Sequence, residues 1–158
     1  MSPLQRVQAQ LARQKWAVDT RDAAALAGLY TADSTQVIYQ AGPDGRTEIA
    51  RSQGRDEIVG AITAGWARTA ATWFPGSLIH QIGSVLAEPA ADGRIRCRSY
   101  ASFLALDPGG TPFLKGYATY DDSWALDAGE WRLACRETVM YGHAPSAADP
   151  GPQKESAQ

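Results

Sequence analysis

The segment RIRCRSYASFLAL, residues 94–106, alternates between two kinds of side chain along most of its length. Arg94, Arg96 and Arg98 fall on one side of an extended chain. The opposite side carries Ile95, Cys97, Ser99, Ala101 and Phe103. This period of two predicts a β-strand with one buried face and one solvated face.

Three further strands are predicted on either side of this segment, at residues 78–88, 113–126 and 130–141. The links between the strands are short and rich in Gly, Pro and Asp: residues 89–93, 107–110 and 127–129. Such links require antiparallel neighbours, because a parallel pair needs a crossover of about a dozen residues or more. The alternation in residues 78–88 leaves open which of its faces is buried.

The N-terminal half of the chain predicts helices and one hairpin. Apolar residues follow helical spacing over residues 3–18, and Asp22 is placed to cap a second helix at 23–30. After a turn at 31–34, a strand at 35–41 enters the GPDG loop, which predicts a hairpin. A third helix begins near Gly54 and ends near Thr72; its core face carries Ile58, Val59, Ile62 and Trp66.

Together these elements predict an α+β fold in which N-terminal helices cover the concave face of a curved antiparallel sheet. Such a concave face is a common place for a ligand, so we expect a pocket for a small, largely apolar molecule. The domain is expected to span residues 1–143, and the Pro- and Ala-rich residues 144–158 are expected to be a disordered tail.

Composition argues against several classes of partner. The 158-residue chain has a formal net charge of −2 and no cluster of Lys and Arg, so nucleic acid is not expected to bind. No apolar run approaches the roughly 20 residues that span a bilayer, and the N-terminus lacks the apolar core of a signal peptide. We therefore expect a cytoplasmic protein with no membrane partner.

Cysteine and histidine spacing predicts neither a disulfide nor a metal site. Cys97 and Cys135 each lie in a predicted strand, where buried reduced thiols are expected. No Cys or His pair has zinc-ligand spacing, since His80 and His143 are far apart in the sequence. No cofactor is expected either.

Four motifs occur in the order typical of one known family. They are KWAVDTRD at 15–22 with Leu26, Leu29 and Tyr30 after it, GRDEI at 54–58, HQIGS at 80–84, and YDDSW at 120–124 followed by GEWRL at 129–133 and Arg136. Over residues 4–141 the chain resembles SnoaL-like proteins, which belong to the superfamily named for nuclear transport factor 2. The resemblance implies a cone-shaped α+β barrel with a deep pocket. Members include scytalone dehydratase, a hexachlorocyclohexane dehydrochlorinase, bile-acid dehydratase, polyketide cyclases, steroid isomerase and dioxygenase small subunits, so the fold alone does not settle function.

The resemblance also implies a set of catalytic residues. Asp19 and His80 match the positions of the acid–base pair of the dehydratase and the dehydrochlorinase. Tyr39 matches a pocket tyrosine of the dehydratase, and Tyr120 matches a pocket asparagine. Two departures argue against scytalone itself as the substrate: Val18 replaces a second pocket tyrosine, and the strand at 99–104 lacks the second catalytic histidine.

Physical chemistry supports a contact between Asp19 and His80. A carboxylate at the C-terminal end of a helix is disfavoured by roughly 0.3–1 kcal/mol, so a partner for Asp19 is expected. The imidazole of His80 would supply that partner, and the carboxylate would orient the ring and raise its basicity. The alternatives are that Asp19 only begins an Asx turn and that His80 is a strand histidine bonded to backbone.

Further residues are predicted to contact substrate: Trp16, Trp66, Trp73, Ser99, Phe103 and Asp122. Tyr39 and Tyr120 would polarise a carbonyl or leaving group through their hydroxyl groups, or would be ordinary core aromatics. For Asp122, a surface position in the last hairpin is an equal alternative, and Arg136 is expected to be structural.

The resulting hypothesis is a cofactor-independent lyase or isomerase. Elimination of the dehydratase type is preferred, because both relatives with this acid–base pair eliminate. The alternatives are a polyketide-type cyclase, which uses the same pocket, and a non-catalytic binding or accessory subunit such as a dioxygenase small subunit. By analogy with such relatives, we expect a homodimer or homotrimer.

Overall fold

Helices and strands follow one another along the chain in the predicted order. The computed structural model describes residues 1–68 and 77–142. Within them lie α1 (Pro3–Asp19), α2 (Ala23–Ala27), β1 (Tyr30–Gly42), β2 (Gly45–Gln53), α3 (Arg55–Arg68), β3 (Leu78–Pro89), β4 (Ile95–Leu106), β5 (Pro112–Asp127) and β6 (Glu130–Tyr141). The expected end of the third helix near Thr72, His143 and the expected tail at 144–158 lie outside the described residues.

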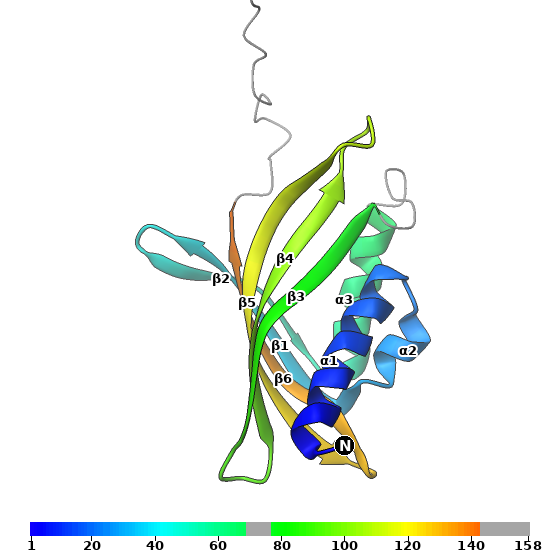
Figure 1. The fold of residues 1–158 in the computed structure, drawn as a ribbon, viewed down its shortest axis with the longest axis vertical. Coiled ribbons are helices and arrows are strands. Elements are labelled where there is room, and N and C mark those ends of the chain that lie inside the picture. The colour runs from blue at the N-terminus through cyan, green and yellow to red at the C-terminus, as the bar shows by residue number, and fades with distance from the viewer. Residues whose placement is uncertain (69–76, 143–158) are drawn as a thin grey trace, which may run out of the picture.

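The six strands form one curved sheet in the order β2-β1-β6-β5-β4-β3 (Figure 1). Neighbouring strands from β3 to β6 are antiparallel, as the short turns predict, and β1 and β2 form the predicted hairpin. One pair differs: β1 runs parallel to β6. This parallel pair is possible because α3 and four strands separate β1 and β6 in the sequence, which leaves ample chain for a crossover.

Local sequence signals fix the start of both N-terminal helices. Ser2 caps α1 and forms a reciprocal capping box with Gln5, and Pro3 occupies the first helical position. Asp22 caps α2 as predicted, because its Oδ1 accepts a hydrogen bond from the backbone N–H of Ala25 at 2.9 Å.

The predicted boundary between α2 and the first strand is wrong. The helix ends at Ala27, and β1 already begins at Tyr30, within the segment expected to be helix and turn. Pairing with the last strand explains the difference: the N–H of Leu133 donates to the carbonyl of Leu29, and Tyr30 lies opposite Leu133. The ladder is then interrupted until Thr35, so the polar residues between them form an irregular start to the strand.

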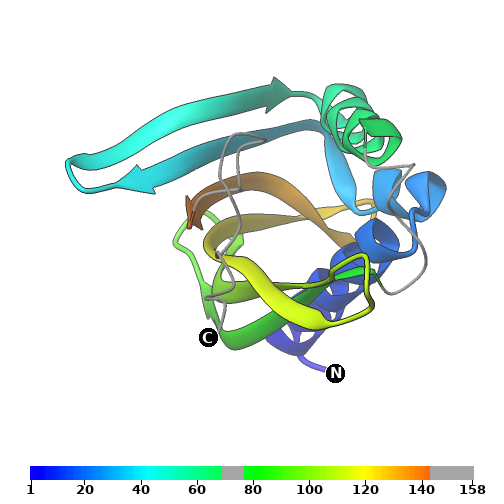
Figure 2. The same cartoon turned by 90° about the horizontal axis from the view of Figure 1, so that it is seen from above.

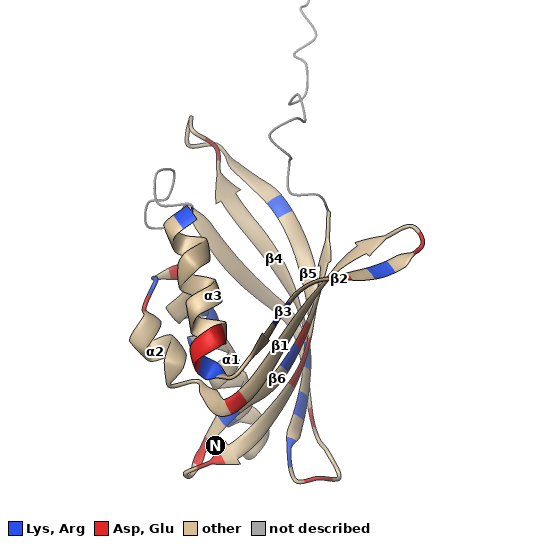
Figure 3. Ribbon diagram, turned by 180° about the vertical axis from the view of Figure 1, so that it is seen from behind, with Lys and Arg blue, Asp and Glu red and all other residues tan. Residues whose placement is uncertain are grey.

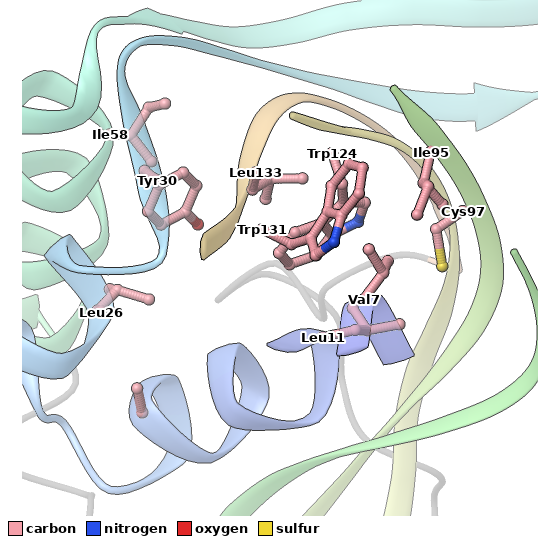
Figure 4. Close-up of a cluster of buried hydrophobic side chains, with 11 residues drawn as sticks. Val7, Leu11, Leu26, Tyr30, Ile58, Ile95, Cys97, Trp124, Trp131 and Leu133 are labelled. Atoms are coloured by element: carbon pink, nitrogen blue, oxygen red, sulfur yellow. The ribbon is translucent and has the colours of Figure 1, made fainter. Parts of the chain in front are cut away.

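The three helices cover the concave face of the sheet (Figure 2). At one end of this face, Val7 and Leu11 of α1 pack against Trp124, Trp131 and Leu133 of β5 and β6 (Figure 4). Burial of each such side chain contributes about 1.5–3 kcal/mol. This cluster anchors α1 to the sheet.

A bulge in β3 settles the face that the sequence left open. The register of β3 against β4 shifts between Gly83 and Leu86, and Ser84 adopts a positive φ of 48°. Before the bulge His80 and its even-numbered neighbours are the less exposed residues, whereas after it the odd-numbered Val85 packs against the core. The bulge therefore allows the strand to place both His80 and Val85 on the concave side.

Positive and negative residues are intermixed along the helices and strands, as at the start of α3, where Arg55 precedes Asp56 and Glu57 (Figure 3). Several on the outer face of the sheet form ion pairs, including Arg96 with Asp121 and Arg98 with Glu88. None of the described helices has the length and apolarity needed to cross a membrane. Both cysteines are free thiols. Cys97 is buried as expected, whereas Cys135 is only half-buried.

Candidate active site

A cavity of about 420 Å³ lies between the C-terminal half of α1 and the concave face of the sheet. This volume falls in the range of small-molecule sites. Its apolar wall is formed by Val18, Ile38, Ile62, Leu78, Phe103 and Met140. Against this wall stand four polar side chains of interest: Lys15, His80, Tyr120 and Arg136. The cavity is thus apolar with a small group of titratable residues.

Asp19 contacts His80, which lines this cavity, as the sequence predicts. Oδ1 of Asp19 lies 2.5 Å from Nδ1 of the His80 ring, and Oδ2 accepts a hydrogen bond from the His80 backbone N–H at 2.9 Å. Both side chains are mostly buried, with 18% and 16% exposed. One carboxylate therefore fixes both the ring and the backbone of His80. Asp19 does not serve as the cap of α2, because that cap is Asp22.

This contact determines which nitrogen of His80 is available for chemistry. An ionised carboxylate only accepts hydrogen bonds, so Nδ1 carries the proton that is donated to Asp19. Among the described residues Nε2 has no hydrogen-bond partner, and the ring lines the cavity. Phe103 holds the ring from the side in an edge-to-face contact with 5.0 Å between centroids. His80 is therefore oriented as a proton acceptor.

The expected rise in the basicity of His80 is not observed. Burial lowers the pKa of His80, and the hydrogen bond to Asp19 only partly opposes this shift; the positive charges of Lys15 and Arg136 lower the pKa further. The ring is therefore neutral near pH 7, which is the form that accepts a proton.

A buried ion pair forms the floor of the cavity. Arg136 donates two hydrogen bonds of 2.7 Å to the carboxylate of Asp122, with only 3% and 0% of the two side chains exposed. Arg136 also donates to Oε1 of Gln14 at 3.0 Å, and Gln14 donates to the hydroxyl of Tyr30 at 3.0 Å. Burial alone would lower the pKa of Arg136, but Asp122 outweighs burial and the net shift is upward. Arg136 is thus a fixed positive charge between the cavity and the apolar core.

Tyr120 lies beside the side chains of Lys15 and Arg136. Nζ of Lys15 is 4.0 Å and Cζ of Arg136 is 4.4 Å from the centroid of its ring. Burial raises the pKa of Tyr120 to about 12, so its hydroxyl stays protonated and able to donate. Tyr120 lines the cavity as predicted.

Comparison with known proteins identifies the family of this chain. Residues 4–137 match the SnoaL-like domain. The chain belongs to the SnoaL-like family. Among curated proteins, no sequence matches this chain significantly.

Solved structures share the fold of this SnoaL-like protein. Aln2 from a Streptomyces species matches 89% of this chain and 93% of its own, with a TM-score of 0.68 and 20% identity. A scytalone dehydratase candidate from Novosphingobium aromaticivorans matches 96% of this chain and 94% of its own, with a TM-score of 0.66 and 17% identity. The beta subunit of a candidate aromatic-ring-hydroxylating dioxygenase from the same organism matches 89% and 90%, with a TM-score of 0.71 and 11% identity. At these identities the likeness shows the fold alone.

Two residues of the SnoaL-like protein that were predicted to line its pocket lie elsewhere. Tyr39 alternates with Ile38 and Gln40, which face the cavity, so its ring is on the outer side, 4.2 Å from Cζ of Arg46. Trp16 follows Lys15 on α1, and one residue turns a helix by roughly 100°. Its side chain therefore points to solvent, and 75% of the residue is exposed. Both predictions are wrong.

The five remaining predicted contacts lie in different places. Phe103 lines the cavity, whereas Trp66 packs against the core cluster instead. Ser99 lies opposite Tyr120 in the β4–β5 ladder and is buried, but it does not line the cavity. Asp122 reaches the cavity only through Arg136, so the alternative of a surface position is excluded. Trp73 lies outside the described residues.

Lys15 is the main residue of the site that sequence reasoning missed. It is four residues before Asp19, a spacing that places two side chains on one face of a helix. This signal is visible in the KWAVD motif, which contributed only to the family resemblance. In the part of the chain that the structure describes, no three His, Cys, Asp or Glu side chains are grouped to hold a metal ion.

Proposed function

We propose that this SnoaL-like protein is a cofactor-independent lyase that removes water from a small, largely apolar molecule by proton transfer through His80. One observation carries the proposal. Asp19 holds both the ring and the backbone of His80, while Nε2 remains open to a mostly apolar cavity. A positioned base of this kind accelerates a proton transfer by about 10²–10⁴-fold.

In the proposed reaction, Nε2 of His80 takes a proton from the carbon next to a carbonyl group. The C–H electron pair moves toward the carbonyl oxygen, where the protonated hydroxyl of Tyr120 and the charge of Arg136 stabilise it. The pair then returns to form a carbon–carbon double bond as a hydroxyl group leaves from the β carbon. The imidazolium gives its proton to that hydroxyl, so water is released and His80 is restored.

Elimination is preferred to isomerisation because both relatives with a matching acid–base pair, a dehydratase and a dehydrochlorinase, eliminate. The fold shared with a scytalone dehydratase candidate is consistent with this preference. A polyketide-type cyclase would use the same base, so product analysis separates it from a lyase.

The test uses a panel of bicyclic β-hydroxy ketones small enough for a cavity of about 420 Å³. Dehydration is followed by the absorbance of the conjugated product, and proton abstraction by uptake of solvent deuterium at the α carbon. We expect His80→Ala and Asp19→Asn to lower kcat/KM by about 10²–10⁴-fold. Tyr39→Phe is the matched control, because that ring is on the outer side.

Full turnover in His80→Ala would refute the proposal. A wild-type protein that binds the probes but neither dehydrates nor exchanges any of them would favour the accessory-subunit alternative.

A further inference from the structure

Lys15 brings a buried primary amine into the cavity. Only 6% of the residue is exposed, and its side chain lines the same cavity as His80. Within residues 1–68 and 77–142, Lys15 forms neither an ion pair nor a hydrogen bond through its amine; its contact is the face of the Tyr120 ring. An amine in this position is available to a ligand.

The nearby carboxylates are already committed to other partners. Asp122 is held by two hydrogen bonds from Arg136, and Asp19 is held by the ring and backbone of His80. A buried ammonium without a dedicated acidic partner is unfavourable, and lysine relieves this by releasing its proton. Burial lowers the pKa of Lys15 well below its ordinary value, and Arg136 lowers it further, while Asp122 and Asp19 oppose the shift.

We propose that Lys15 is an amine nucleophile that captures an aldehyde or ketone group in the cavity as a Schiff base. The proposal rests on the function proposed above and deepens it, because it identifies the substrate class as carbonyl compounds. The nitrogen lone pair of Lys15 attacks the carbonyl carbon and a C–N bond forms. The carbonyl oxygen then leaves as water after taking up one proton from the amine and one from solvent. The product is a protonated imine.

A Schiff base at Lys15 would make the proton transfer to His80 easier. The positively charged imine nitrogen accepts the electron pair that is released when Nε2 takes the α proton, and an enamine forms. The enamine returns its electron pair as the β-hydroxyl group leaves as water with the proton from His80. A second water then hydrolyses the imine and frees Lys15. One water is released on capture, one on elimination and one is consumed, so the net reaction is a dehydration with no oxidant or reductant.

The chain itself supplies the control amines. Its lysines are Lys15, Lys115 and Lys154. Lys115 also borders the cavity, but it is exposed and belongs to β5 near the end of the sheet. Lys154 lies outside the described residues. A reagent that reacts through a Schiff base therefore reports on a buried and an exposed lysine at the same site.

The experiment treats the full chain with 1-naphthaldehyde and cyanoborohydride at pH 7, and maps the stable secondary amines by peptide mass spectrometry. The ratio of neutral amine to ammonium rises about tenfold for each unit by which a pKa falls, so we expect Lys15 to be labelled about tenfold faster than Lys115 or more. Lys15→Met should remove the fast label, and Lys115→Arg should retain it.

Labelling confined to Lys115, Lys154 and the N-terminal amine, or labelling of Lys15 no faster than that of Lys115, would overturn the proposal. The map of the wild-type protein decides this even where Lys15→Met fails to fold. His80→Ala separates the two proposals: we expect it to keep the Lys15 label while losing turnover. Turnover by the wild type without a Lys15 label would leave His80 as the base and refute the Schiff base alone.

Discussion

The chemistry of the site depends on how burial changes the pKa of two side chains, His80 and Lys15. Both are expected to lose their protons more easily than in water, because burial disfavours the charged form of each. Asp19 orients His80 but does not overcome burial. The site therefore combines a histidine and a lysine that both release their protons more readily than in water, beside the fixed charge of Arg136.

The lowered pKa of His80 gives the first prediction about pH. A base works when it is neutral, so the fall of activity on the acid side of the pH profile should be centred below the ordinary pKa of histidine. An NMR titration measures the pKa directly, and since the chain has two histidines, the spectrum of His80→Ala assigns the signal. Asp19→Asn should lower the pKa further, because it removes the charge that opposes burial. A His80 pKa above its ordinary value would contradict this account.

The lowered pKa of Lys15 makes a prediction about stability. A lysine whose pKa is lower in the folded than in the unfolded protein destabilises the fold in acid and neutral solution, and this effect disappears as the pH rises past the unfolded value of about 10.4. Lys15→Met should therefore raise Tm at pH 6, by about 2–4 °C for each kcal/mol recovered, and the gain should shrink at pH 10.

Calorimetry of Lys15→Met and of the exposed control Lys115→Met at both pH values tests this prediction. Any effect of hydrophobic packing is independent of pH. The decisive quantity is therefore the difference between the gain in Tm at pH 6 and the gain in Tm at pH 10. A gain that is equal at pH 6 and pH 10 would argue against a buried, easily deprotonated Lys15.

Between elements, an ion pair joins Asp122 of β5 to Arg136 of β6, and a hydrogen bond from Arg136 to Gln14 connects this pair to α1. Loss of one partner of a buried ion pair leaves an uncompensated charge and costs about 3–5 kcal/mol. Asp122→Ala should therefore lower the free energy of unfolding by this amount. The neighbouring Asp121→Ala is a matched control, since Asp121 pairs with Arg96 on the exposed face and should contribute about 0–1 kcal/mol. Urea unfolding of both variants compares them, and equal losses would be inconsistent with the buried network.

Element types were largely predictable from the sequence, but their register was not. The last hairpin shows the reason. Its turn pairs Asp127 with Glu130, and a regular ladder counted from this pair would put Asp122 opposite Cys135. A bulge between Ser123 and Trp124 shifts the pairing by one residue, and Asp122 therefore meets Arg136. No pattern in the sequence marks this bulge.

The site residues also differ in how far the sequence could predict them. The contact between Asp19 and His80 was suggested by the family resemblance and by the need for a partner at the helix end. The prediction for Tyr39 failed because it came from the family resemblance alone, and an error of one residue in matching a strand moves a side chain to the other face. Lys15 was missed because burial of its side chain depends on α1 packing against the sheet.

Over the entire molecule, the concave side of the sheet is divided into two compartments. Apolar side chains around Trp124 fill one end, and the cavity occupies the other. The network of Asp122, Arg136, Gln14 and Tyr30 lies at their boundary. Stability and chemistry thus use different parts of one concave surface.

The position of β6 in the sheet has a consequence for synthesis of the protein. β6 is the last strand to be made, yet it lies between the early hairpin of β1 and β2 and the later strands β3 to β5. While the chain is still emerging from the ribosome, the two halves of the sheet have no strand to join them, and both expose unpaired edges. Assembly of the cavity is therefore a late step, completed only after translation has passed Tyr141.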